Sequence, residues 1–211
     1  MQTELNNHIT LLENKGAISP KVVKLNSTID QEIIFSEVKE ISPDLKSWFS
    51  LINGYDEDAC LDLDVEAPDF LWQMHLLSLE ESQEHYEDHS GCGEPENPDY
   101  WPLGFIPILW GGSGDYIVIN SIAGSKTYGA VYEMTDGVGV NRISNTIANF
   151  LSDCSKILEL GLIQFEDPEV CTITDYSKYP EYLYTCQDIF NNPPYFSRLG
   201  GQMDTQIIDW K

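Results

Sequence analysis

The clearest alternation of apolar and polar positions lies in residues 42–54, SPDLKSWFSLING. The large apolar side chains recur at the three- and four-residue spacing of a helix that faces a core: Leu45, Trp48, Phe49 and Ile52. Ser42 is a good N-cap, and Pro43 suits the first helical position. The pair Asn53-Gly54 follows, and glycine readily adopts the left-handed conformation that ends a helix. We therefore predict a core-facing helix here.

A second helical pattern covers residues 145–160, NTIANFLSDCSKILEL, and is followed by Gly161. One face of this helix is apolar and consists of Ile147, Phe150, Leu151, Cys154 and Leu158. Two weaker signals indicate further helices. Ser78 and Glu81 have the spacing of a capping box, which predicts a helix start, and a short helix is expected over residues 5–13.

Runs of large apolar residues predict a set of buried strands, the last of which follows the hairpin-like segment TDGVGV. The expected strands cover residues 70–79, 105–110, 116–120 and 130–134, with one more ending near Ile143. An acidic loop is expected over residues 55–69. The order of helix, strands and helix, with hairpin-like connections, predicts an α+β fold with one largely antiparallel sheet flanked by helices.

The length of 211 residues suits one domain. We predict a domain over residues 1–161 and a C-terminal extension over residues 162–211 that packs on it. The extension is rich in aromatic residues and prolines, and a short helix is expected around residues 181–190.

The charge of the chain is strongly one-sided, with a formal net charge of −24. No Lys or Arg occurs between Lys46 and Lys126, while the same stretch carries these acids: Asp56, Glu57, Asp58, Asp62, Asp64, Glu66, Asp69, Glu80, Glu81, Glu84, Glu87, Asp88, Glu94, Glu96, Asp99 and Asp115. Such a chain repels nucleic acid and anionic membrane surfaces, and it attracts a basic protein. An acidic run can serve only to solvate a surface, but its length here favours a surface that faces a partner.

Neither the start of the chain nor its cysteines indicate export. The first residues, MQTELNNHIT, lack the basic and apolar regions of a secretory signal. No run approaches the ~18 apolar residues of a membrane-spanning helix. The five cysteines are widely spaced without a CxxC pair, which fits reduced thiols: Cys60, Cys92, Cys154, Cys171 and Cys186. A cytoplasmic protein is expected.

The glycine-rich segment between two apolar runs, GFIPILWGGSGDYIVIN at residues 104–120, raises the question of phosphate binding. A P-loop needs GxxxxGK[ST] and a Rossmann turn must lead into a helix, whereas here no lysine is near and an expected strand follows Gly114. Asp115 would also repel phosphate, and it is a natural residue for hydrogen bonds to turn amides. We interpret the segment as two core strands joined by a tight turn, without a nucleotide site.

Other chemistry can be weighed residue by residue. Glu81, His85 and His89 follow a helical spacing with Cys92 just beyond, which would permit a metal site, but a solvated acidic helix fits this polar segment better. The acidic loop lacks the glycine and glutamate positions of an EF-hand, and no nucleophile elbow is present. A carboxylate pair for glycoside hydrolysis stays open, because its separation is a three-dimensional property. We expect no cofactor, no metal and no catalytic residues.

The order of several short motifs resembles the SUKH superfamily over residues 40–160. These motifs are a helix ending in Asn-Gly, a Trp-containing strand leading into SLEE, FIPI, a glycine turn with GDY, and GAVYEM before a closing amphipathic helix. The sharpest part, which we expect to be structural, comprises Phe105, Pro107, Gly114, Asp115 and Tyr116. Leu109 and Asn120 depart from the pattern. The resemblance implies an α+β fold and a function in protein binding without catalysis, since bacterial members are commonly immunity proteins of polymorphic toxin systems.

The leading hypothesis is therefore an immunity protein that binds a basic toxin, a nuclease, through its acidic surface. The expected contacts are Asp56, Glu57, Asp58, Asp62 and Asp64, followed by Glu80, Glu81, Glu84 and Glu87. Aromatic residues in or beside the acid-rich stretch are candidate anchors: Trp72, Tyr86, Tyr100, Trp101 and Trp110. The alternatives are a regulatory or scaffold protein of the same fold and, from another class, an enzyme that uses the acidic loop.

Overall fold

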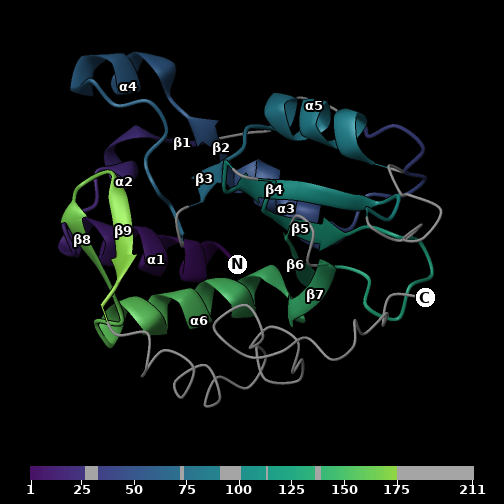
Figure 1. Ribbon diagram of the computed structural model, residues 1–211. Coiled ribbons are helices and arrows are strands. Elements are labelled where there is room, and N and C mark those ends of the chain that lie inside the picture. The colour runs from purple at the N-terminus through teal and green to yellow at the C-terminus, as the bar shows by residue number, and fades with distance from the viewer. Residues whose placement is uncertain (27–32, 72–73, 91–100, 113, 136–138, 175–211) are drawn as a thin grey trace.

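A five-stranded antiparallel sheet forms the centre of the fold in the computed structural model, which describes residues 1–26, 33–71, 74–90, 101–112, 114–135 and 139–174 (Figure 1). Its strands lie in chain order: β3 (His75–Leu76), β4 (Phe105–Trp110), β5 (Tyr116–Asn120), β6 (Val131–Thr135) and β7 (Gly139–Ser144). Every neighbouring pair is antiparallel. The predicted α+β class with an antiparallel sheet is confirmed.

Six helices are found among the described residues: α1 (Gln2–Asn14), α2 (Ser19–Val22), α3 (Pro43–Leu51), α4 (Glu57–Leu63), α5 (Leu79–His89) and α6 (Ile147–Glu159). Helix α6 contacts β7 of the sheet and carries α1 packed against it, and α5 packs on β4 (Figure 1). The helix expected over residues 5–13 is longer at both ends than predicted, and the helix expected over residues 145–160 begins after the N-cap Thr146. No helix in these described ranges is long and apolar enough to cross a membrane.

Helix α3 begins as predicted but ends earlier. The Ser42 hydroxyl accepts a hydrogen bond from the Leu45 N–H at 3.2 Å, and Pro43 occupies the first position. The helix stops at Leu51, because the chain passes directly into strand β2 (Ile52–Tyr55), which pairs antiparallel with β1 (Val23–Leu25). Gly54 therefore lies in a strand. Its φ is +69°, and a Cβ there would approach the Ser78 nitrogen to 2.9 Å, so glycine permits this close crossing.

Two expectations near the acidic stretch were wrong in detail. The expected loop over residues 55–69 contains helix α4, because Asp56 caps it: the Ala59 N–H donates to Asp56 Oδ1 at 3.0 Å. In the described part of the expected strand over residues 70–79, only β3 and an isolated bridge between Leu71 and Met74 are found, and residues 72–73 lie outside the described residues. Leu71 and Met74 exchange backbone hydrogen bonds with each other.

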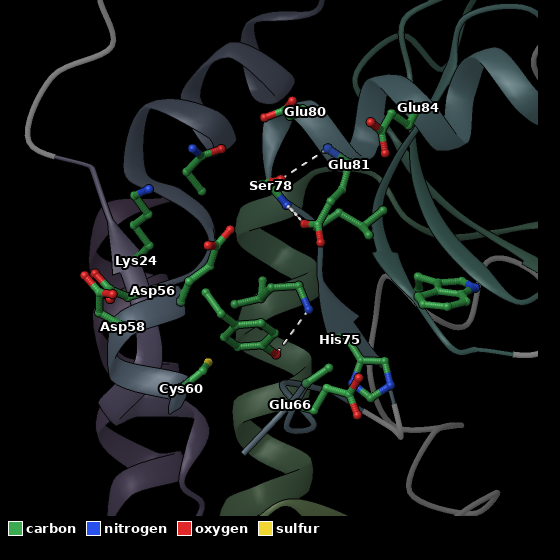
Figure 2. A pocket seen from close by; sticks show the side chains of 17 residues that line it. Lys24, Asp56, Asp58, Cys60, Glu66, His75, Ser78, Glu80, Glu81 and Glu84 are labelled. Atoms are coloured by element: carbon green, nitrogen blue, oxygen red, sulfur yellow. Dashed lines mark hydrogen bonds between the residues drawn. The ribbon is translucent and has the colours of Figure 1, made fainter. Parts of the chain in front are cut away.

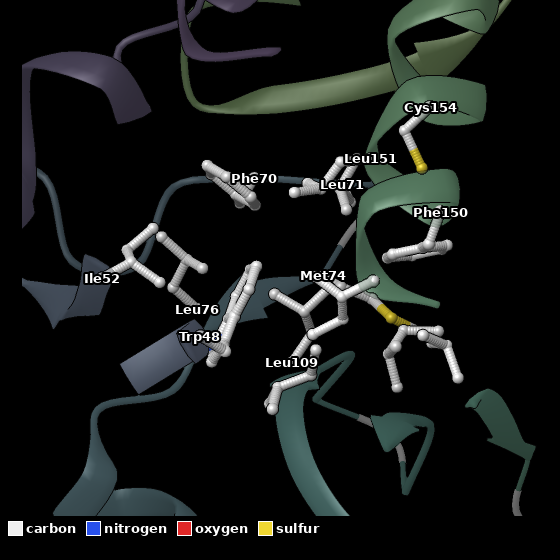
Figure 3. Packing of buried hydrophobic residues seen from close by; sticks show 14 of the residues in the cluster. Trp48, Ile52, Phe70, Leu71, Met74, Leu76, Leu109, Phe150, Leu151 and Cys154 are labelled. Carbon is white, nitrogen blue, oxygen red and sulfur yellow. The ribbon is translucent and has the colours of Figure 1, made fainter. Parts of the chain in front are cut away.

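The main core lies between the sheet and helices α1, α3 and α6 (Figure 3). Trp48 of α3, Leu109 of β4 and Phe150 of α6 are fully buried in it. All five residues predicted for the apolar face of α6 are buried. A second cluster, which includes Tyr116, Val118 and Tyr132, occupies the opposite face of the sheet, because side chains alternate along each strand.

The glycine-rich segment is a β-hairpin, as interpreted from its sequence. Strands β4 and β5 pair antiparallel, with Trp110 opposite Tyr116, and the residue after the turn enters a strand instead of a helix. Gly114 has a φ of +87°, which favours glycine, and the Gly111 N–H donates to the Asp115 carbonyl at 2.8 Å. Phe105, Pro107 and Tyr116 lie in the two strands. The role expected for the Asp115 carboxylate stays a prediction.

A further hairpin that was not predicted follows α6. It consists of β8 (Ile163–Asp167) and β9 (Val170–Ile173), and Ile163 and Cys171 are buried in the main core. The proposed boundary at residue 161 stays a prediction, and the helix expected around residues 181–190 lies outside the described residues. So does part of the TDGVGV turn before β7.

Candidate functional site: an acidic concavity

Two acidic segments that are distant in the sequence line one concavity of about 750 Å³ (Figure 2). Asp56, Glu57 and Asp58 come from the start of α4, and Glu80, Glu81 and Glu84 come from α5. Glu66 adds a further carboxylate from the segment after α4. The described residues of the lining thus contribute seven carboxylates, beside Lys24 and His75. The concavity, defined by this lining, is a strongly electronegative hollow.

The α4 wall of the concavity is held by a small apolar cluster beneath it. Val22, Cys60 and Val65 are buried together, with Tyr55 and Ala59 packed against them. This packing fixes the inner side of α4, while Glu57 and Asp58 stay exposed on the outer side. Both acids also lie in the first helical turn, where negative charge interacts favourably with the helix dipole. The acids therefore project from a fixed support.

The α5 wall begins at the predicted capping box, which is confirmed. The Glu81 N–H donates to Ser78 Oγ at 3.1 Å, and the Ser78 N–H donates to Glu81 Oε2 at 2.7 Å. Two further bonds tie the helix down: the Leu79 N–H donates to Asn53 Oδ1 at 2.7 Å, and Ser82 Oγ donates to the Pro107 carbonyl at 2.5 Å. Glu81 is consequently engaged in the cap.

The floor of the concavity is a hydrogen-bonded layer. The Tyr55 hydroxyl donates to the Pro68 carbonyl at 2.5 Å and accepts from the Leu76 N–H at 3.2 Å. Burial raises the pKa of Tyr55 well above its usual value, so this phenol stays protonated. Tyr55 therefore serves to connect β2, β3 and the segment before Phe70.

Asp69 belongs to the acid-rich stretch but does not face the solvent. It is only 4% exposed, and its Oδ2 accepts a hydrogen bond from the Cys171 N–H at 2.8 Å. Burial raises the pKa of Asp69. The hydrogen bond from Cys171 and the charge of nearby His75 act in the opposite direction and offset part of this increase. His75 Nδ1 lies 3.9 Å from Asp69 Oδ1. Asp69 thus anchors the β8–β9 hairpin beneath the concavity.

Six of the nine acids expected to contact a partner line the concavity, and three do not. Asp62, Asp64 and Glu87 are exposed but lie outside the lining. The sequence interpretation missed Lys24, Glu66 and His75 as contact residues, and it named Trp110 as one of five candidate anchors. Glu66 carried a signal, since it belongs to the same acidic run. Lys24 carried none, because only the pairing of β1 with β2 brings it here.

The candidate aromatic anchors divide by burial. Tyr86 and Trp101 are buried, so neither presents its ring at the surface. Trp110 is half-buried and lines the concavity, where its ring lies 6.3 Å from that of His75. Trp72 and Tyr100 lie outside the described residues. Among the candidate anchors that the structure describes, Trp110 is the one that lines the concavity.

The histidines that were considered as metal ligands pack against aromatic rings. His85 Nδ1 lies 2.9 Å from the Tyr116 hydroxyl, and the His85 ring contacts Trp110 at a centroid distance of 5.1 Å. Burial, and then the charge of His89, lower the pKa of His85. No group of three or more potential metal ligands is found in the part of the chain that the structure describes, and Cys92 lies outside it.

The concavity also contains a thiol, that of Cys60. Burial raises its pKa, and the neighbouring Asp56 and Glu57 raise it further. A thiol is a nucleophile only as the thiolate, which these surroundings disfavour. The chemistry that this arrangement supports best is therefore electrostatic recognition of a cationic surface by carboxylates.

Comparison with known proteins agrees with this fold. No curated protein matches the chain. A sequence model of the SMI1 / KNR4 family (SUKH-1) matches residues 37–153, which include α3, the sheet and the lining of the concavity apart from Lys24. The match covers more than half of the 211 residues and confirms the resemblance seen in the motifs. The chain therefore belongs to the SMI1 / KNR4 family (SUKH-1).

Proposed function

We propose that this protein is an intracellular immunity protein that binds and neutralises a cognate basic toxin, a nuclease, without catalysis of its own. The observation that carries the proposal is the concavity, in which acids from residues 56–58 and residues 80–84 face the same hollow. Family membership supports a function in protein binding.

The physical reason lies in the charge that a nuclease must carry. An enzyme that holds a phosphate backbone presents Lys and Arg on its substrate surface. An acidic surface of matching shape can occupy those groups and exclude the substrate. The net charge of −24 adds long-range attraction, which mainly increases the association rate. Trp110 at the wall supplies an aromatic contact within this charged surface.

The test uses the product of the gene immediately upstream as the binding probe. In a charge-reversed variant, Glu57, Asp58 and Glu84 are each replaced by Lys, because these exposed acids take no part in the caps of α4 or α5. We expect an association rate reduced about tenfold or more at low salt, with a weaker dependence on ionic strength. The matched control replaces Glu13, Glu40 and Glu159 by Lys, which changes the net charge equally at exposed positions outside the concavity.

The possible outcomes test the immunity function and the assignment of the contact surface separately. Unimpaired binding by the charge-reversed variant would mean that another surface contacts the toxin. Failure of the wild-type protein to bind the upstream product, or to protect cells that express it, would contradict the immunity function itself.

The second candidate is a regulatory or scaffold protein of the same fold. Family membership favours it as well, because the match concerns a fold that binds proteins and does not specify a toxin. A gene for a toxin immediately upstream favours immunity, and its absence favours regulation.

A further inference from the structure

Helix α4 turns a large apolar side chain toward the solvent. Leu61 is 78% exposed, the highest value among the large apolar residues that the structure describes. Leu63, at the end of the same helix, is 41% exposed. Exposed leucines are common one at a time, so the position of Leu61 has to decide whether it has a function.

Leu61 is held on a fixed helix. Asp56 caps the start of α4, and at its end Asp64 adopts a left-handed conformation with a φ of +55°. The Val65 N–H then donates to the Cys60 carbonyl at 3.0 Å, which closes the last turn. The buried side of the helix packs on the cluster of Val22, Cys60 and Val65. The exposure of Leu61 is therefore a property of an ordered helix.

Leu61 also shares a side of α4 with two acids that line the concavity. Residues three and four positions apart lie on the same side of a helix. Glu57 and Asp58, which line the concavity, precede Leu61 by these distances. Asp62 is its exposed neighbour in the sequence. Leu61 is thus an exposed apolar side chain on the side of α4 that carries Glu57 and Asp58, although it is not itself part of the lining.

We propose that Leu61 is an apolar anchor for a protein partner whose surface has an apolar depression bordered by Lys and Arg. This deepens the proposed function and rests on it for the partner's basic character. Charge complementarity indicates the kind of partner, because the surrounding carboxylates repel nucleic acid and anionic membranes and attract basic side chains. Burial of Leu61 adds apolar contact that slows dissociation, while the acids increase the association rate.

The experiment uses a synthetic amphipathic helical peptide of leucine and lysine, in which the leucines form one face bordered by lysines. Its dissociation constant is measured by calorimetry with the wild-type protein and with L61S. We expect L61S to weaken binding about tenfold, because a buried leucine side chain is lost from the contact. L160S is the matched control: Leu160 follows α6, is 58% exposed and lies outside the concavity, so less than about a twofold change is expected.

A second peptide, in which alanine replaces every leucine, keeps the charge and removes the large apolar face. Wild type and L61S should bind it equally. Equal binding of the leucine peptide by wild type and L61S would overturn the proposal, and so would an equal loss in L160S. These outcomes do not depend on the toxin: loss of peptide binding in L61S supports the anchor even where the upstream gene product is not neutralised.

Discussion

Helices α5 and α6 differ in how much of their surface is buried. Helix α6 buries eight of its 13 residues, whereas α5 buries three of its 11: Leu79, Ser82 and Tyr86. Helix α6 contacts α1, β7 and β8, and α5 packs mainly on β4. Packing on several sides holds α6 in the core, while α5 is held by these three buried residues, its cap and a few hydrogen bonds. The comparison shows how one fold supplies both a core helix and the wall of an exposed concavity.

The largest expected effect comes from the same substitution in the two helices. Leu151 of α6 is fully buried, and Leu79 of α5 is 3% exposed. L151A should lower the free energy of unfolding by about 4 kcal/mol and L79A by about 2 kcal/mol, since the cost of Leu→Ala grows with the cavity that stays unfilled. Urea denaturation measures both values. Equal losses would show that α5 is packed as tightly as α6, which would contradict the comparison.

A smaller effect is expected from acidification, through the contact between α1 and α6. His8 of α1 is fully buried, with Nδ1 3.2 Å from Ser155 Oγ of α6, and burial lowers its pKa from 6.5 to about 4. Between these two pH values, His8 is protonated in the unfolded chain and neutral in the folded protein. His8 therefore costs no stability above pH 6.5, where it is neutral in both states. The free energy of unfolding decreases as the pH falls from 6.5 to about 4.

Between pH 7 and pH 5 this loss amounts to about 2 kcal/mol. It is measured as the difference in unfolding free energy at the two pH values, with H8Q as the variant that lacks the titration. The matched control is N7Q, which changes an exposed side chain beside His8 on α1 without a titratable group and should keep the wild-type pH slope. A wild-type slope in H8Q would refute the assignment of this loss to His8.

The smallest expected effect concerns the two N-caps. Ser78 caps α5 and Thr146 caps α6, where its Oγ1 accepts from the Asn149 N–H at 3.2 Å. S78A and T146A should each cost about 1 kcal/mol. Hydrogen exchange should distinguish them: amides of α5 should exchange faster in S78A, whereas those of α6 should be little changed in T146A, because packing holds that helix. If S78A and T146A increased the exchange rates of their helices equally, α5 would not depend more strongly on its cap than α6 does.

The fold was predicted well where one signal was local and strong. The apolar face of α6, the capping box at Ser78 and the two strands of the glycine hairpin all follow from short-range periodicity or spacing. Predictions were less accurate where the end of an element depends on pairing with a distant strand. The end of α3 and the reduced strand before α5 depend on β2 and β3, whose partners are distant in the sequence.

The candidate site was predictable in part for the same reason. Charge alone identified the acidic segments, including six lining acids, because acids are read directly from the sequence. It did not separate Asp69 from its neighbours, although Asp69 is buried and bonds to Cys171. The sequence did not indicate Lys24 or select Trp110 from the five candidate aromatic anchors, because strand pairing and helix placement form the concavity.

The sequence by itself determined the α+β class, the family signature around the glycine hairpin and the excess of acids, because periodicity, short motifs and charge are local properties. Only the tertiary structure decided which acids face one another. The two acidic segments are brought together because Asn53 and Gly54 in β2 cross closely at the start of α5. That contact joins residues far apart in the chain, and no local pattern encodes it.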